Sequence, residues 1–264
     1  MSNTKIFYNG DFHTMNKERP GAEAMACREG VIIGVGKMYD LADLAKDAEL
    51  VDLKGGYVFP GFIDTYSAPG LAAFTAAAEA EEDYEADDRS QWLKDCRDYL
   101  YDKGVATLCV HGANTWFPVA TEGPDHKAQH DDSERPQMRV LENISYRTDF
   151  ERDISEDYYD GILGSPDSTF LLFSPVCDDS SSVHDAVARL TWQAAENIGR
   201  EDLGILDPGK RADLTVFDIN PFENDMHTFQ RIHASMIIVD GEVVYDEEEA
   251  AKEEWYDLLV TQMF

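Results

Sequence analysis

Short apolar runs separated by turn residues indicate that the first part of the chain is rich in β-strands. The runs Ile6–Tyr8 and Phe12–Met15 flank Asn9-Gly10-Asp11, and an Asn-Gly pair accepts the positive φ angles of a tight hairpin turn. A second hairpin is predicted over Ala24–Val35, with its turn at Arg28-Glu29-Gly30. The opening pattern therefore predicts two successive β-hairpins.

The end of the chain has the same character. A strand is predicted over Ala212–Phe217, and the runs Ser235–Val239 and Glu242–Tyr245 flank Asp240-Gly241, which is another hairpin signal. Neither β-rich end is large enough to be stable alone, so we expect one sheet system that contains both. Before residue 60, the pattern also predicts a short helix over Met38–Lys46 and strands at Val51–Leu53 and Tyr57–Phe59.

The middle of the chain changes to alternating strands and helices. Val105–Val110 is a continuous apolar run, which is typical of a strand covered on both faces. Gly104, just before it, suits the end of a helix. Shorter strands are predicted at Arg139–Leu141 and Thr169–Phe173. Helices are predicted over Leu71–Glu82, Ser90–Lys103, Val183–Ile198 and Glu247–Phe264. A polar loop is predicted over residues 118–136.

The composition describes an acidic globular protein. Of the 264 residues, 43 % are hydrophobic and 11 % aromatic, which is typical of a packed domain. The formal net charge of −31 excludes nucleic acid and anionic membranes as expected partners, because binding to either needs positive charge. We interpret the acids as a solvated surface, with a docking face for a basic partner as the alternative. The four cysteines form no CxxC pair and no leader or membrane span is visible, so we expect a soluble cytoplasmic protein.

Two separated blocks carry a family resemblance. The first, Lys5–Asp64, ends in Pro60-Gly61-Phe62-Ile63-Asp64, in which proline fixes φ and glycine permits close backbone approach. The second combines Leu190–Gly199 with Gly204–Leu214 and contains Gly209-Lys210-Arg211-Ala212-Asp213. Together these blocks resemble the metal-dependent amidohydrolase superfamily over somewhat less than half of the chain.

The resemblance implies a β-sandwich made from both chain ends and an α/β barrel between them. It also implies a metal site that begins with a His-x-His pair directly after Asp64, but Tyr66 and Ala68 stand at those two positions. A phenol is a poor zinc ligand and a methyl group is none. Asp178 or Asp179 would correspond to the aspartate that ends the family's last barrel strand. We therefore expect no catalytic residue, no metal ligand and no cofactor, with zinc expected only if an active site has been rebuilt.

Length indicates that the barrel is shortened. A complete barrel of this kind takes about 250 residues, whereas Phe62–Arg200 has room for three or four strand–helix units of roughly 30 residues each. The predicted fold class is α/β plus β. It combines a small β-sandwich from residues 1–61 and 203–246, an incomplete TIM-barrel-like α/β domain over 62–202, and a C-terminal helix over 247–264. An open sheet needs its edges covered, so a homodimer is expected.

Four residues are candidates for a pocket at the former metal site: Asp64, Tyr66, His111 and Asp178. His111 follows the strongest interior strand, where it either lines a pocket or makes a purely structural hydrogen bond. The Tyr66 phenol either contacts a ligand or packs against the body of the protein. None of the four is assigned a catalytic role.

Two further histidine groups receive structural interpretations. His126 and His130 fall in the polar loop, and they would share a face for an adventitious metal only if that segment were helical. His184-Asp185 follows Ser180-Ser181-Ser182, and we interpret these serines as helix caps rather than as part of a Ser/His/Asp triad.

Three functions remain open from the sequence. The first is an amidohydrolase-like protein that is catalytically silent and has a binding or assembly role. The second is a hydrolase of non-peptide carbon–nitrogen bonds whose site has been rebuilt or is completed by a partner chain, for example with Asp64, His111 and Asp178 and a zinc-bound water. The third is a sensor that binds a small molecule in the old pocket around Tyr66.

Overall fold

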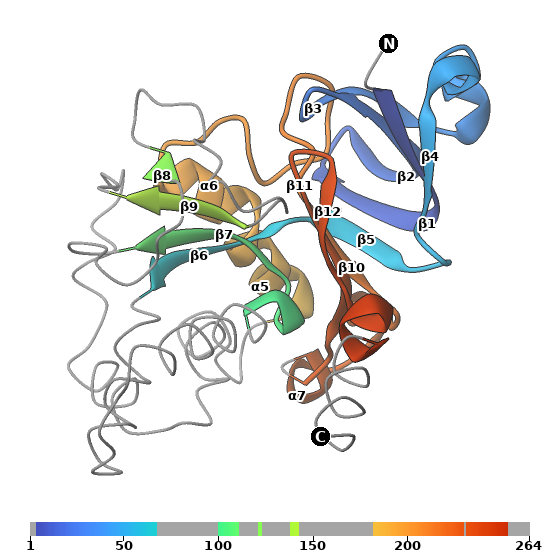
Figure 1. The fold of residues 1–264 in the computed structure, drawn as a ribbon. Coiled ribbons are helices and arrows are strands. Elements are labelled where there is room, and N and C mark those ends of the chain that lie inside the picture. The colour runs from blue at the N-terminus through green and yellow to red at the C-terminus, as the bar shows by residue number, and fades with distance from the viewer. Residues whose placement is uncertain are drawn as a thin grey trace, which may run out of the picture.

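The structure, a computed structural model, describes residues 4–67, 100–110, 121–122, 138–142, 182–229 and 231–252. These residues form two sheets that meet at the centre of the molecule (Figure 1). The larger sheet has eight strands in the order β12-β11-β10-β5-β1-β2-β3, with β4 paired to β1, and the smaller has four strands in the order β6-β7-β9-β8. No helix within the described ranges is long and apolar enough to cross a membrane.

The strands of the larger sheet come from both ends of the described chain. They are β1 (Thr4–Asn16), β2 (Arg19–Arg28), β3 (Val31–Gly36), β4 (Glu49–Asp52), β5 (Tyr57–Pro60), β10 (Leu214–Phe217), β11 (Ala234–Val239) and β12 (Glu242–Asp246). The smaller sheet contains β6 (Phe62–Ser67), β7 (Val105–Val110), β8 (Thr121–Glu122) and β9 (Arg139–Glu142). The helices are α5 (Val183–Leu190), α6 (Trp192–Asn197) and α7 (Met226–Phe229), with 3-10 turns η1 (Met38–Leu41), η2 (Ala45–Asp47) and η4 (Pro221–Glu223).

The two chain ends join where β10 runs antiparallel to β5. Leu214 pairs with Pro60, and Phe217 pairs with Tyr57. The common sheet that the sequence led us to expect is therefore present, and β10 to β12 extend it from the side opposite β1 to β3.

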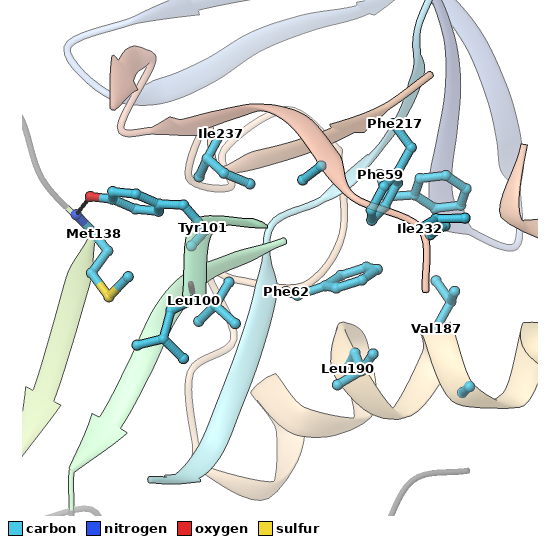
Figure 2. Close-up of a cluster of buried hydrophobic side chains, with 14 of the residues drawn as sticks. Phe59, Phe62, Leu100, Tyr101, Met138, Val187, Leu190, Phe217, Ile232 and Ile237 are labelled. Carbon is cyan, nitrogen blue, oxygen red and sulfur yellow. Dashed lines mark hydrogen bonds between the residues drawn. The ribbon is translucent and has the colours of Figure 1, made fainter. Parts of the chain in front are cut away.

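Alternate residues of β5, β10 and β11 face two different cores. Val58, Val216 and Ile238 belong to a hydrophobic cluster that is formed mainly by side chains of the larger sheet itself. Their neighbours in sequence, such as Phe59 and Phe217, belong to a second cluster that also contains residues of the smaller sheet and of α5. Figure 2 shows this second cluster, in which Phe62 lies among side chains from both sheets. Burial on both faces explains why these strands are almost continuously apolar in sequence.

The smaller sheet is parallel throughout. β7 lies between β6 and β9, and β8 pairs with the outer side of β9. On one face of this sheet, Ile63, Cys109 and Leu141 pack against Ala195 and Ile198 of the α6 segment. The arrangement agrees with the alternating strands and helices predicted for the middle of the chain, and β7 has the predicted bounds.

The first predicted hairpin is wrong. β1 continues through Asn9-Gly10 with a shift in its register to β2, and the chain reverses only at residues 17–18. Asn9 does adopt a positive φ of 56°, so the local signal was correct, but it marks a kink. The second hairpin and the Asp240-Gly241 hairpin are confirmed, since Gly30 and Gly241 both have positive φ within the predicted turns.

Two predicted helices are interrupted. The segment Met38–Lys46 forms two separate 3-10 turns instead of one helix. The segment Val183–Ile198 breaks at Thr191, which has φ −122° and ψ −104°, and the Thr191 hydroxyl donates to the Val187 carbonyl at 2.6 Å. A threonine hydroxyl that satisfies a helix carbonyl competes with the backbone ladder, which favours a break here.

Several predictions fall largely outside the described residues. They are the helix over Leu71–Glu82, the strand at Thr169–Phe173 and the loop over residues 118–136. For the helix over Ser90–Lys103 only its end is described, and it stops at Gly104, which has a φ of 88° as a helix-terminating glycine requires. A helix begins at Glu247, as predicted, and is described as far as Lys252.

Candidate functional site

The candidate site lies where the parallel strands β6, β7 and β9 end. The carboxyl ends of parallel strands meet at one edge of a sheet, and in α/β proteins this edge carries the ligand-binding residues. Asp64 lies on β6 opposite Leu108 of β7, and Ser67 pairs with Val110 further along. The Asp64 residue is buried, with 8 % of its surface exposed. A carboxylate is thus held inside the protein on the strand that leads to this edge.

The turn Pro60-Gly61 leads the chain from the larger sheet directly into β6. The Gly61 N–H donates to the Asp213 carbonyl at 2.8 Å. A β-carbon on Gly61 would lie 2.5 Å from the Ala106 Cβ, so only glycine fits between β7 and the segment before β10. The motif before β6 is therefore explained by close packing of three strands.

Thr215 fixes the start of β6 against the start of β7. Its hydroxyl accepts from the Phe62 N–H at 3.2 Å and donates to the Gly104 carbonyl at 2.6 Å. Thr215 is fully buried on β10. One side chain of the larger sheet thus links the first residue of β6 to the residue that precedes β7.

A buried charged network fixes the start of β9. The Arg139 guanidinium donates to both oxygens of the Asp213 carboxylate at 3.0–3.2 Å, and to the Asp240 carboxylate at 2.6 Å. Asp213 also accepts from the Asp240 N–H at 2.8 Å, and Arg211 pairs with Asp240 from the other side. Burial raises the pKa of the Asp213 carboxyl, while Arg139 opposes this rise.

The network gives the Gly209–Asp213 motif its physical meaning. The sequence Asp207-Pro208-Gly209 is typical of a turn before a strand. The structure adds that Asp213 bonds to the smaller sheet and to the hairpin turn at Asp240. The signal in the sequence was a single aspartate between the apolar residues Ala212 and Leu214, at a position that becomes buried.

Parts of this chain match known proteins in sequence. A model described as "Amidohydrolase family" matches residues 176–245. Imidazolonepropionase of Geobacillus kaustophilus is 39 % identical over 64 residues, which cover 24 % of this chain and 15 % of that protein. Dihydroorotase of Lactobacillus gasseri is 33 % identical over 101 residues, which cover 32 % of this chain and 24 % of that protein. The matching segments thus span at most about a quarter of these relatives.

A solved structure extends the likeness to most of the fold. Triazine hydrolase from Arthrobacter aurescens has a TM-score of 0.56 at 13 % identity, over 92 % of this chain and 95 % of that chain. At this identity the likeness concerns the fold alone, which is that of the amidohydrolases. The sequence matches and the shared fold together support a place in the amidohydrolase superfamily.

The four predicted pocket residues of this amidohydrolase relative are only partly described. Asp64 is buried on β6, and the backbone of Tyr66 lies two residues further along the same strand. His111 and Asp178 lie outside the described residues, as does Ala68. The structure therefore brings Asp64 and Tyr66 onto one strand and does not test whether the other two join them.

The residues that follow Asp64 in the sequence are not zinc ligands. Tyr66 and Ala68 replace the expected histidine pair, and neither a phenol nor a methyl group substitutes for neutral imidazole toward zinc. In the part of the chain that the structure describes, histidine, cysteine, aspartate and glutamate form no group of three that could hold a metal ion.

The capping interpretation is confirmed for Ser182, whereas Ser180 and Ser181 lie outside the described residues. The Ser182 hydroxyl accepts from the Asp185 N–H at 3.2 Å at the start of α5, and the Asp185 carboxylate is bonded back to Ser182. The ring of His184 stacks on Phe222 with centroids 3.6 Å apart. His184 and Asp185 thus have structural partners, and the predicted His126 and His130 lie outside the described residues.

Sequence reasoning missed a second histidine beside His184. His13 of β1 stacks on Phe59 at 4.7 Å and meets the edge of Phe222 at 5.0 Å. Burial lowers the pKa of His13, against the opposing effect of the Asp11 carboxylate. The alternation of the first strand gave no signal for this contact, because Phe222 lies far away in sequence.

Proposed function

We propose that this amidohydrolase relative is catalytically silent and has a binding or assembly role. The observation that carries the proposal is the sequence at and directly after the end of β6. This strand follows the family's proline-glycine turn, yet Tyr66 and Ala68 occupy the positions of the paired histidines. A metal-dependent hydrolase needs a firmly held metal to activate water, and one buried carboxylate at Asp64 is too few ligands.

The proposed domain organisation supports this function. Residues 1–61 and 203–246 form a composite β-sandwich, residues 62–202 a shortened TIM-barrel-like domain, and residues 247–264 a C-terminal helix. The sheet shared by β5 and β10 supports the composite sandwich. The short length between the two motifs supports the shortened barrel. Two copies of the chain pair so that the edges of the barrel-like sheet are covered.

The proposed binding site is the former metal pocket, lined by Asp64, Tyr66, His111 and Asp178. A phenol, an imidazole and carboxylates can together bind a small polar molecule through hydrogen bonds. The same pocket serves a sensor role, in which a ligand binds without being converted. The protein acts in the cytoplasm, without nucleic acid or a membrane as partner.

Two measurements test the proposal. Light scattering after gel filtration is expected to give twice the mass of one chain, and a thermal-shift screen of small polar molecules is expected to find ligands that raise the melting temperature. Tyr66→Phe should weaken that shift if the phenol contacts the ligand, whereas Tyr39→Phe, at an exposed tyrosine of η1, should leave it unchanged. A monomer that binds none of the molecules would contradict the proposal.

The second candidate is a hydrolase of non-peptide carbon–nitrogen bonds with a rebuilt or partner-completed site. The observation in its favour is that the curated relatives are named imidazolonepropionase and dihydroorotase. Zinc would be its cofactor, and Asp64 would be needed. Amides, cyclic ureas and deamination substrates are to be screened with and without added zinc. Turnover that a chelator abolishes and that Asp64→Asn removes would establish this candidate in place of the first.

A further inference from the structure

The kink in β1 is hydrogen-bonded to the end of β4 and to the turn that follows it. Asn9 is exposed and has a φ of 56°, in the left-handed region that Asn accepts more readily than most residues. Its carbonyl accepts from the Gly55 N–H at 2.7 Å, and its side-chain amide donates to the Asp52 carboxylate at 2.7 Å. The kink is thus bonded to the turn between β4 and β5.

Packing requires glycine at the next position. A β-carbon on Gly10 would lie 2.7 Å from the Val58 side chain and 3.3 Å from the Gly56 carbonyl. The left-handed conformation at Asn9 and the crowding at Gly10 together explain why the chain carries Asn-Gly here, although no hairpin turn forms. This dipeptide occurs once in the sequence.

Asn-Gly is also the dipeptide in which an asparagine side chain is most readily attacked by its own backbone. Glycine has no β-carbon to hinder the approach of its amide nitrogen to the preceding side chain. We propose that Asn9 is a site of spontaneous deamidation in this protein. The Gly10 nitrogen attacks the Asn9 Cγ and forms a new C–N bond, while the bond from Cγ to Nδ2 breaks and ammonia leaves. Water then opens the resulting succinimide to an aspartate or an isoaspartate.

The product would disturb the contacts of the kink. Asp52 accepts from the Asn9 amide and from the Lys54 N–H at 2.8 Å. The hydrogen bond from Asn9 is the main cause that lowers the pKa of Asp52. A carboxylate in place of the amide removes this donor and sets two negative charges side by side. An isoaspartate also lengthens the backbone, which displaces the Asn9 carbonyl from the Gly55 N–H.

The kink lies next to the turn that leads into β5. The β4–β5 turn leads into β5, and β5 leads through Pro60-Gly61 into β6. Deamidation would loosen the turn before β5 and would add negative charge to a chain that already carries a formal charge of −31. This inference does not depend on the proposed function, because it concerns the scaffold.

Ageing of the purified, folded chain tests the chemistry. After incubation at mildly alkaline pH, trypsin digestion gives the peptide Ile6–Lys17, which contains Asn9 and Asn16, and fragmentation in the mass spectrometer assigns a mass gain to one of the two. We expect this peptide to gain the mass of an amide-to-acid conversion at Asn9 and to split into aspartate and isoaspartate forms. The peptide Ala212–Arg231, with Asn220 and Asn224 but no Asn-Gly, should stay unchanged. An unmodified Asn9 in the folded chain, with conversion only after unfolding in urea, would overturn the proposal.

Matched variants test the consequence. Asn9→Gly keeps a residue that accepts positive φ and should prevent the mass gain at this position. Asn9→Asp imitates one product and should lower the melting temperature, and adding Asp52→Asn to it should restore a donor–acceptor pair and part of the loss. If Asn9→Asp melts at the wild-type temperature, the structural effect of the aspartate product is refuted.

Discussion

The two ends of the parallel strands in the smaller sheet differ in what the structure places there. At the amino ends, Gly61, Thr215 and Asp213 bind the starts of β6, β7 and β9 to the larger sheet. Toward the carboxyl end of β6 lie the buried Asp64 and, two residues further on, Tyr66. The amino ends thus carry the contacts that hold the two sheets together, whereas the carboxyl end of β6 carries the candidate site. Fold and function therefore rest on different residues, and substitutions can address them separately.

The largest loss of stability is expected when the buried charged network at the start of β9 is broken. Asp213→Ala leaves the Arg139 guanidinium with only part of its partners in a buried place, and removing one member of such a pair costs about 3–5 kcal/mol of stability. Urea unfolding measures this loss. Asp207→Ala is the matched control, because the Asp207–Arg19 pair is largely exposed and should change stability by at most about 1 kcal/mol. If the two substitutions lower the free energy of unfolding equally, Asp213 does not hold the two sheets together more strongly than a surface aspartate does.

A smaller loss of stability is expected from a substitution in the Pro60-Gly61 turn that leads into β6. Gly61→Ala adds a β-carbon 2.5 Å from the Ala106 Cβ, and overpacking of this kind costs about 1–3 kcal/mol. Thermal unfolding should show the loss. Gly21→Ala in β2 is the control, because its β-carbon would meet only the Phe12 carbonyl, at 3.7 Å. A Gly61→Ala protein as stable as Gly21→Ala would show that the close approach is not required.

The smallest change in stability is expected from a substitution of His13, and this change depends on pH. Because the pKa of His13 is lowered by burial, the folded chain favours the neutral ring. The stabilisation that comes from keeping the His13 ring neutral is therefore fully present above pH 6.5, the ordinary pKa of histidine. It is lost as the pH falls from there through the lowered pKa of the folded chain. His13→Phe keeps the stacking on Phe59 and should reduce this loss in unfolding experiments across that window.

His227→Gln provides the control for this pH experiment. His227 is exposed in α7, so its replacement removes a histidine without removing a buried ring. If His13→Phe and His227→Gln give the same pH dependence of stability, protonation of His13 in the folded chain carries no penalty.

Local patterns predicted most of the described strands correctly. The apolar run Val105–Val110 has the bounds of β7, and the Asp240-Gly241 turn joins β11 and β12. At Asn9 the pattern identified a left-handed residue but not the kink, because Val58 and the β4–β5 turn pack against Gly10. Short-range signals define conformations of single residues, whereas tertiary packing decides whether the chain turns.

The candidate site was less accessible to sequence reasoning. Asp64 was predicted and is buried on β6, but the role of Asp213 depends on Arg139, 74 residues away in sequence. The contact between His13 and Phe222 is similarly long-range. A single sequence gives no pairing information over such distances, so these partners could be recognised only from the fold.

Zinc content tests the central claim most directly. Elemental analysis is to be made on the purified chain after equilibration with zinc, beside the double variant Tyr66→His, Ala68→His, which restores both imidazoles. The account predicts far less than one zinc per wild-type chain and a higher content in the double variant. A stoichiometric zinc ion in the wild type, with hydrolysis that a chelator abolishes, would contradict it.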